Sequence, residues 1–344
     1  MGQKIDAKRR AVLIGFGLTA LAACSPPGLP QRGQRTAQAS SGGSSDRPSE
    51  GGVGGTGIFG LVHGTASLLV NGLTVETPPG LAVRHALGAL PLDAVDAGHA
   101  VTVEAAAGQD GRLVAAAVTV EHPLIGRIES LTEGGFRCLG VEVLVEPGAL
   151  LKGPEGIFRP TPGQRVAVSG LWRGNGVVVA ARVDLLSAVS LDDVVAGVAL
   201  AGGARGRLRL GGLDLVLPPG TPEPQAGGFV TAVGRRRGDL LIAERVTAGR
   251  FRGLAGPLER LSVEGYLEPQ PAPPGYAVSG LGHSFDEAAK LGALADERAV
   301  FIGAYDGAFK VARGLPLPEG VAERRVILAA VDDGFAPEAA VVTR

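Results

Sequence analysis

A β-hairpin pattern that recurs along the chain constrains the fold more than any other feature of the sequence. Its clearest copy is Gly163–Leu186, GQRVAVSGLWRGNGVVVAARVDLL. Val166 and Val168 alternate with polar or small residues, which is the period of a half-buried strand. The Asn-Gly pair between the two halves tolerates the positive φ of a tight turn. Similar patterns recur at 98–122 and 227–249 and, more weakly, at 298–314.

Two glycine positions recur in the same order as this hairpin. One lies in an opening strand and the other in a central ribbon, and each recurs roughly every 70 residues, as expected of a repeated structural unit. The opening-strand glycines are Gly60, Gly126, Gly197 and Gly265, and the ribbon glycines are Gly72, Gly140, Gly212 and Gly280. The pattern predicts four β repeats, joined by linkers at 187–193 and 250–261. These repeats span 58–122, 124–186, 194–249 and 262–314.

Within each repeat we expect three strands, a variable insert and two further strands. The insert is partly helix-like in the first repeat, a Pro/Gly-rich loop in the second and helix-like in the fourth, SFDEAAKLGALADERA. This order predicts an all-β chain of tandem OB-fold-like barrels, with short helical or loop inserts between the third and fourth strands. Another small closed barrel or a β-sandwich repeat is the alternative. Barrels of roughly 65 residues are marginally stable alone, so we expect the repeats to pack together.

The last segment, 321–344, reads as a partial repeat or a capping β-hairpin. Its sequence, VAERRVILAAVDDGFAPEAAVVTR, places Asp332-Asp333-Gly334 between two apolar runs, as a turn. An exposed ribbon over 326–342 would suit a component that binds partners by β-strand addition.

Three short motifs of this chain resemble those of a known family. They are the G-x-[VI] opening, the ribbon with its glycine, and the hairpin GxxVxVxGxxxxxG. In this combination they resemble bacterial export-targeted proteins with tandem copies of the domain of unknown function 5666. The resemblance covers nearly all of residues 58–314. It implies a fold more than a function, because the family supplies no established activity and no catalytic residues.

The N-terminal residues have the order of a bacterial lipoprotein signal. Lys4, Lys8, Arg9 and Arg10 are basic, and the apolar run that follows is too short for an ordinary transmembrane helix. The run ends in Leu-Ala-Ala-Cys, which resembles a lipobox. The resemblance implies a signal peptide at 1–23 and a diacylated Cys24 at the new N-terminus.

Residues 24–57 are rich in Pro, Ser and Gly and almost devoid of large apolar side chains, so they predict a flexible tether. Two or more acyl chains on Cys24 would hold the chain firmly on a membrane. Ser25, rather than Asp, follows the cysteine. By the sorting rule of enterobacterial lipoproteins, this favours the periplasmic face of the outer membrane over the inner membrane.

No known catalytic or metal-binding motif is present in the sequence. There is no GxSxG, Walker loop, HExxH or CxxC, and the five histidines lack a metal-ligand spacing. Cys138 matches apolar positions of the other repeats, so we expect a buried core residue rather than a reactive thiol. We predict no catalytic residue, no metal and no cofactor.

Arginines of the third repeat form the sharpest candidate site. Arg205, Arg207 and Arg209 alternate with small or apolar residues, so their side chains should share the outward face of one strand. Arg235, Arg236 and Arg237 follow in the hairpin turn of the same repeat. Together they suit an anionic glycan or a phosphate-bearing lipid head group. The alternative is a solvated face paired with nearby Asp and Glu.

These features favour a non-enzymatic, membrane-anchored envelope lipoprotein whose barrels bind a protein or glycan partner. The alternative is an envelope hydrolase of glycan or peptide, with its site between repeats. Nucleic acid is not expected as a partner, because the formal net charge is −1 and aromatic residues are only 4% of the chain.

Overall fold

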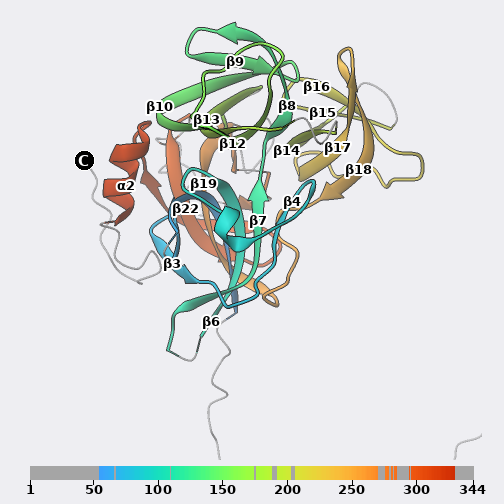
Figure 1. Cartoon of the computed structure of the whole chain (residues 1–344). Coiled ribbons are helices and arrows are strands. Elements are labelled where there is room, and N and C mark those ends of the chain that lie inside the picture. Colours follow the sequence, from blue (N-terminus) through green and yellow to red (C-terminus); the bar gives the residue numbers. More distant parts are fainter. Residues whose placement is uncertain are drawn as a thin grey trace, which may run out of the picture. The chain divides into compact units, whose positions relative to one another are not determined.

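In the computed structural model, strands and tight turns make up most of the residues that the structure describes (Figure 1). This confirms the all-β fold class. The expected signal peptide, Cys24, nearly all of the tether and Arg205 lie outside the described residues. The described residues all belong to one compact unit, 51–344. They are 54–65, 67–108, 110–173, 176–187, 192–202, 206–269, 276–278, 280–281, 283–284, 294 and 296–329.

The first repeat closes into a five-stranded ring, which we call barrel 1. Neighbours in the ring follow the order β1-β2-β3-β7-β6, and β6 pairs back with β1. Only the β3–β7 pair is parallel. The strands are β1 (Gly55–Gly64), β2 (Leu68–Val70), β3 (Leu73–Glu76), β6 (Ala100–Ala107) and β7 (Leu113–Glu121).

The insert of barrel 1 differs from the partly helical segment that the sequence predicted. It forms a side hairpin, β4 (Val83–His85) and β5 (Gly88–Leu90), followed by one 3-10 turn, η1 (Leu92–Ala94). Gly88 has a φ of +147°, and Pro91 follows the hairpin, so neither position suits a continuous α-helix. β4 also pairs in parallel with β7, which fixes the hairpin to the side of the barrel.

Barrels 2 and 3 close in the same order as barrel 1. In each, the third strand pairs in parallel with the fifth, and the fourth pairs back with the first. Barrel 2 consists of β8 (Leu124–Thr132), β9 (Gly135–Cys138), β10 (Val141–Gly153), β12 (Arg165–Arg173) and β13 (Val177–Leu185), with the short β11 (Gly156–Ile157) beside β10. Barrel 3 consists of β14 (Asp193–Ala201), β15 (Arg207–Leu210), β16 (Leu213–Val216), β17 (Phe229–Arg237) and β18 (Leu240–Ala248).

The fourth repeat, unit 4, has the corresponding pairs. β19 pairs with β20 and β22, β22 pairs with β23, and β23 pairs in parallel with β21. Its predicted helical insert lies almost wholly outside the described residues. The strands are β19 (Leu258–Pro269), β20 (Tyr276–Val278), β21 (His283–Ser284), β22 (Arg298–Tyr305) and β23 (Phe309–Pro316).

The ribbon glycines occupy two-residue turns with positive φ. Gly72 follows Asn71, with φ values of +80° and +56°, and Gly140 follows Leu139, with +77° and +52°. Two consecutive positive φ values define the turn whose twist matches that of the flanking strands. Glycine at the second position avoids the steric cost of this conformation, which explains the recurrence seen in the sequence.

The hairpin glycine Gly170 marks a β-bulge in barrel 2. The pairing register of β12 with β13 shifts between Ser169 and Gly170. A Cβ at Gly170 would overlap the carbonyl oxygen of Val179 on the partner strand. The register shifts at the glycine in barrel 3 and unit 4 as well, whereas barrel 1 carries Ala105 there.

Gly170→Ala is therefore expected to lower the free energy of unfolding by about 2 kcal/mol, since the partner strand must move away. Urea denaturation of the purified protein measures this change. Gly64→Ala is the matched control, because a Cβ there meets only the Leu69 side chain at 3.6 Å. Equal stability of the two variants would contradict the close-approach explanation.

The barrels associate through their first strands. β1 of barrel 1 pairs in parallel with β19 of unit 4, and β8 of barrel 2 pairs with β14 of barrel 3 in the antiparallel direction. Two continuous sheets result, one from the outer repeats and one from the inner repeats. The first and last repeats are thus neighbours in space although they are farthest apart in the sequence (Figure 1).

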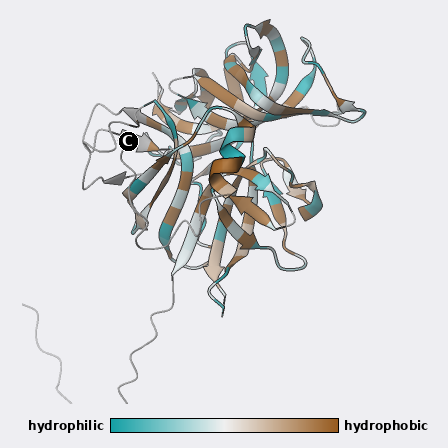
Figure 2. Ribbon diagram, turned by 90° about the vertical axis from the view of Figure 1, so that its left-hand side faces the viewer, coloured by the Kyte–Doolittle hydropathy of each residue, from teal (hydrophilic) through white to brown (hydrophobic). Residues whose placement is uncertain are grey.

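Apolar side chains fill the barrels and also join them. Brown and teal residues alternate along many strands in Figure 2, as expected when one face of a strand is buried. One cluster fills barrel 1, and another is shared by barrels 2 and 3. A third combines Phe59 of barrel 1, Leu171 of barrel 2 and Phe301 of unit 4. This third cluster explains why marginal barrels are stable here, because each buries apolar surface against its neighbours.

The predicted capping hairpin at 321–344 is wrong over its first part. Val321–Ala329 forms helix α2, and residues 330–344 lie outside the described part of the chain. The apolar residues of this segment are also compatible with a strand. Tertiary contacts favour the helix, because it buries Arg324 and Leu328 on one side. Among the described residues, no helix is both long and apolar enough to span a bilayer.

Four buried charged side chains connect barrel 2, unit 4 and helix α2. Arg298 donates from Nη1 to Glu146 at 2.9 Å and from Nη2 to Glu264 at 2.7 Å. Arg324 of α2 donates to the other oxygen of Glu146 at 2.6 Å. The second oxygen of Glu264 accepts from the backbone N–H of Leu61 at 2.8 Å. All four side chains are at most 5% exposed, so this network is shielded from solvent.

Candidate anion-binding cleft between barrels 1 and 3

A cleft with a volume of about 300 Å³ lies between barrel 1 and barrel 3. The side hairpin of barrel 1 forms one wall through Arg84, His85 and Ala86. Strands β17 and β18 of barrel 3 form the opposite wall. The segment 249–252, which leads from barrel 3 to unit 4, lines the remaining side. The insert that distinguishes barrel 1 thus forms one wall of the cleft.

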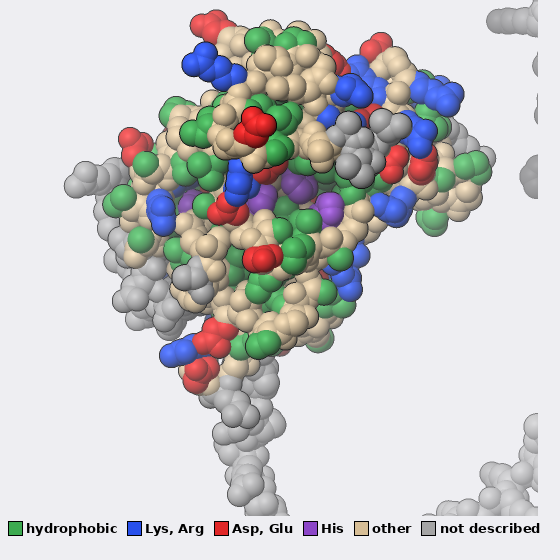
Figure 3. Space-filling model, in the orientation of Figure 1, with side chains coloured by type: hydrophobic (Ala, Val, Ile, Leu, Met, Phe, Trp, Pro, Cys, Tyr) green, Lys and Arg blue, Asp and Glu red, His purple; other side chains and the backbone are tan. Residues whose placement is uncertain are grey.

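The charge of the cleft is strongly positive. Four arginines line it, Arg84, Arg245, Arg250 and Arg252, whereas Glu121 is its single carboxylate. Three of these arginines are exposed, and only Arg250 is buried. In Figure 3, histidine side chains (purple) lie near the centre of one face of the molecule, with basic (blue), acidic (red) and hydrophobic (green) side chains around them. A concave surface with one sign of charge concentrates ions of the opposite sign.

Arg245 joins the two walls of the cleft. Its Nη2 donates to the carbonyl oxygen of Ala86, at the tip of the side hairpin, at 2.5 Å. Ala86 and Leu87 also pack against an apolar cluster at the junction of barrels 2 and 3. These contacts fix the hairpin, so Arg84 and His85 are held in place at the cleft wall.

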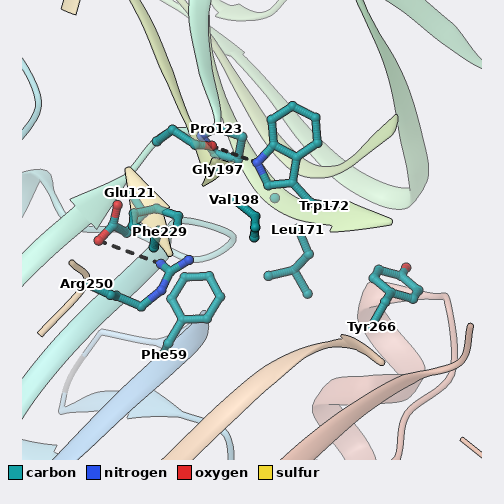
Figure 4. A pocket seen from close by; sticks show the side chains of 12 residues that line it. Phe59, Glu121, Pro123, Leu171, Trp172, Gly197, Val198, Phe229, Arg250 and Tyr266 are labelled. Carbon is teal, nitrogen blue, oxygen red and sulfur yellow. Dashed lines mark hydrogen bonds and ion pairs between the residues drawn. The ribbon is translucent and has the colours of Figure 1, made fainter. Parts of the chain in front are cut away.

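Arg250 is buried between two phenyl rings (Figure 4). Its guanidinium carbon lies 3.6 Å from the ring centroid of Phe59 and 3.7 Å from that of Phe229. Phe59 belongs to barrel 1 and Phe229 to barrel 3, so the stack connects the two barrels. Cation–π contacts of this kind gain strength when they are shielded from water.

The edge of the Arg250 guanidinium is poorly paired. Nη1 lies 3.8 Å from Glu121, beyond hydrogen-bond distance, and Nε and Nη1 have no hydrogen-bond partner in the described structure. Glu121 instead accepts from the Thr102 hydroxyl at 2.8 Å. Burial lowers the pKa of Arg250 to about 10, against the opposing effect of Glu121. The side chain therefore stays positively charged at neutral pH.

A second, smaller cavity (Figure 4) shares Glu121, Phe229 and Arg250 with the cleft. Its volume of about 20 Å³ is enough for a single water molecule. Trp172 and Tyr266 line it, and the indole N–H of Trp172 donates to the carbonyl of Ala196 at 2.7 Å. Tyr266 is buried and Trp172 is partly buried, so both act as packing residues between barrels.

Three histidines of barrel 1 come together beside the cleft. The ring centroid of His122 lies 6.2 Å from those of His85 and His99, with the rings edge to face. Burial lowers the pKa of His122 to about 3, and burial also lowers that of His85, so both are neutral at neutral pH. No three His, Cys, Asp or Glu side chains in the described part of the chain are arranged to hold a metal ion.

The arginines predicted from the third repeat lie elsewhere on barrel 3. Arg207 and Arg209 alternate with buried leucines, so they face outward as expected. Arg209 pairs with Asp214 at 2.9 Å, Arg235 lies 3.7 Å from Asp192 and Glu244, and Arg236 pairs with Glu129 of barrel 2. Arg235, Arg236 and Arg237 end strand β17 instead of forming the turn itself.

Sequence reasoning missed the cleft because its residues are far apart in the chain. Arg250 and Arg252 were assigned to a linker, although Arg250 is only 7% exposed. The alternation of basic and aromatic residues in Arg250-Phe251-Arg252 was the available signal. Cys138 is fully buried and burial raises its pKa to about 12, as expected for a core residue.

One family match was found for this chain. Residues 125–184 match the family described as "Domain of unknown function (DUF5666)". No characterised protein and no solved structure matched in the corresponding comparisons. The matched range runs from β8 to β13. Barrel 2 is therefore a DUF5666 domain.

Proposed function

We propose that this chain is a non-enzymatic, lipid-anchored protein of the cell envelope, and that it binds an anionic glycan or protein partner in the cleft between barrels 1 and 3. One observation carries the proposal: four guanidinium groups and a single carboxylate line the cleft. Guanidinium groups recognise anionic oxygens through charge-assisted hydrogen bonds. The fixed side hairpin and the buried Arg250 give the site the preorganisation that binding requires.

The same proposal includes an anchor and a repeated architecture. The sequence supports diacylation of Cys24 and attachment to the periplasmic face of the outer membrane. The strand order shared by the three closed barrels supports tandem OB-like units, because it combines a three-stranded meander with a parallel pairing of the third and fifth strands. We extend the DUF5666 assignment from barrel 2 to the other three repeats on this basis.

The cleft is a better candidate than the outer arginine face of barrel 3. Arg209, Arg235 and Arg236 already face carboxylates. By contrast, no ion pair of Arg84 or Arg252 is found among the described residues. At Arg84 and Arg252 an incoming anion would therefore not compete with a carboxylate that is already paired.

The hydrolase alternative receives less support from the cleft. Glycoside hydrolysis commonly uses two carboxyl groups on opposite sides of the scissile bond. The lining contains only Glu121, whose Oε1 accepts a hydrogen bond from Thr102. The two histidines that line the cleft, His85 and His122, both belong to barrel 1, so they do not form a pair contributed by two repeats.

The proposal is tested by elution of the purified protein from dextran sulfate resin in a salt gradient. Arg84→Gln/Arg252→Gln is expected to elute at clearly lower salt than the unmodified protein, because two exposed cleft charges are lost. Arg137→Gln/Arg159→Gln removes two exposed arginines of barrel 2 and is the charge-matched control.

Equal effects of the cleft and control variants would mean that only net charge matters, and the proposal would be wrong. A specific effect of Arg207→Gln/Arg209→Gln would instead assign binding to the outer face of barrel 3. Both outcomes are read from the same gradient.

A further inference from the structure

The buried guanidinium of Arg250 is the feature of this molecule that most needs a partner. It is covered on both faces by phenyl rings, and the nearest carboxylate oxygen is 3.8 Å away. A charge removed from water is costly unless it is paired and hydrogen-bonded. A buried cation that lines a solvent-filled cleft is therefore stabilised when an anion binds there.

The cleft around Arg250 carries more positive charge than a ligand with a single carboxylate would neutralise. Four arginines against Glu121 leave three net positive charges, with His85 and His122 neutral. The three arginines that are exposed, Arg84, Arg245 and Arg252, come from three different segments of the chain. Donors from several directions suit a tetrahedral anion with three or four oxygens better than a planar carboxylate.

The remaining lining groups suit a sugar. Three threonines line the cleft: Thr119 of barrel 1, and Thr231 and Thr247 of barrel 3. Hydroxyl groups donate and accept hydrogen bonds, as sugar hydroxyls do. The volume of about 300 Å³ lies at the lower end of the range of small-ligand pockets, roughly 300–1,000 Å³. A ligand the size of one phosphorylated monosaccharide matches this space.

We infer that the cleft binds a phosphomonoester carried by a sugar, with the phosphoryl group among Arg84, Arg250 and Arg252 and the sugar against the threonines. This inference rests on the proposed function and narrows its anionic ligand to one chemical class. Arg250 acts mainly through its charge, since its Nε and Nη1 atoms are themselves buried. The exposed arginines make the direct hydrogen bonds.

Isothermal titration calorimetry of the full chain with three probes tests the inference. Glucose 6-phosphate represents the proposed ligand. Glucuronate replaces the phosphoryl group by a carboxylate on a similar ring, and inorganic phosphate lacks the sugar. We expect glucose 6-phosphate to bind about tenfold or more tightly than either, because the extra charge and the sugar contacts both contribute. Arg84→Gln/Arg252→Gln should weaken this binding about tenfold or more, whereas Arg137→Gln/Arg159→Gln should leave it unchanged.

Each other outcome overturns the inference. Glucuronate binding as tightly as glucose 6-phosphate would mean that the site selects no phosphoryl group, while the proposed anion-binding function would survive. Inorganic phosphate binding as tightly would exclude a role for the sugar. Absence of binding by all three probes, with retention on dextran sulfate still dependent on the cleft, would restrict the site to polymeric ligands. Loss of that retention as well would remove both proposals.

Discussion

Arg298→Met is expected to lower the free energy of unfolding by about 3–5 kcal/mol, because it leaves two buried carboxylates without their shared cation. Glu146 and Glu264 both accept hydrogen bonds from Arg298. Burial raises the pKa of Glu146 even in the intact network. At Glu264 burial also acts to raise the pKa, but Arg298, His63, Arg324 and the Leu61 N–H together outweigh it and lower the pKa. Urea denaturation of the purified variant measures the loss.

Two further variants show whether the expected loss of stability in Arg298→Met arises from the burial of its carboxylate partners. Arg112→Met removes an exposed cation that pairs with Glu76 at 2.8 Å and is expected to leave the free energy of unfolding nearly unchanged, because water screens this pair. Glu264→Leu/Arg298→Met removes both members of one buried pair and leaves the Glu146–Arg324 pair intact. Its loss of unfolding free energy should therefore be smaller than the sum of the losses in the two single variants. A cost below about 1 kcal/mol for Arg298→Met would contradict the network's role in joining barrel 2, unit 4 and α2.

Lowering the pH from 7 to 4 is expected to destabilise the fold by about 3 kcal/mol through His122 alone. Its pKa is about 3 in the folded chain, against an ordinary value of 6.5. Between these values the unfolded chain binds the extra proton and the folded chain does not. Stability is therefore full above about pH 6.5 and falls as the pH decreases towards 3.

The sources of the low His122 pKa are burial first, and then the neighbouring His99 and His85. Arg182 also lowers it, and Asp184 opposes these effects. His122→Gln is expected to reduce the pH dependence of the urea midpoint between pH 6.5 and 4, while His63 and His85, whose pKa values are also lowered, keep their own contributions. This window lies above the ordinary pKa of 3.8 for Asp96 and Asp184, so these carboxyl groups contribute little. Identical slopes for the variant and the unmodified protein would contradict the prediction.

Local sequence patterns predicted the hairpins well, because their causes are local. The alternation of Val166 and Val168 reports the face of β12 that lines the barrel, where both side chains are buried. The opposite face is buried as well, because β12 packs against neighbouring parts of the molecule, so the strand is not half-buried as the alternation predicted. Gly140 recurs because glycine adopts the positive φ of its turn without steric cost. A glycine recurs at the Gly170 position in barrels 2 and 3 and in unit 4, where the partner strand approaches closely. Such constraints act over a few residues, and they leave a signature that can be read in the sequence.

The same reasoning failed where tertiary contacts outweigh local preference. The apolar residues of Val321–Ala329 read as a strand, but burial of Arg324 against Glu146 accompanies a helix. The insert of barrel 1 read as partly helical, but β4 pairs with β7 instead. In both cases the decisive partner lies far away in the sequence.

By itself, the sequence determined an all-β chain of repeated short strands, the outward direction of Arg207 and Arg209, and the burial of Cys138. Only the tertiary structure decided that β1 pairs with β19 and that Arg84 and Arg250 line one cleft. The physical reason is that strand alternation and turn conformation depend on neighbouring residues. Association of barrels depends on which whole surfaces bury the most apolar area and pair the most buried charge.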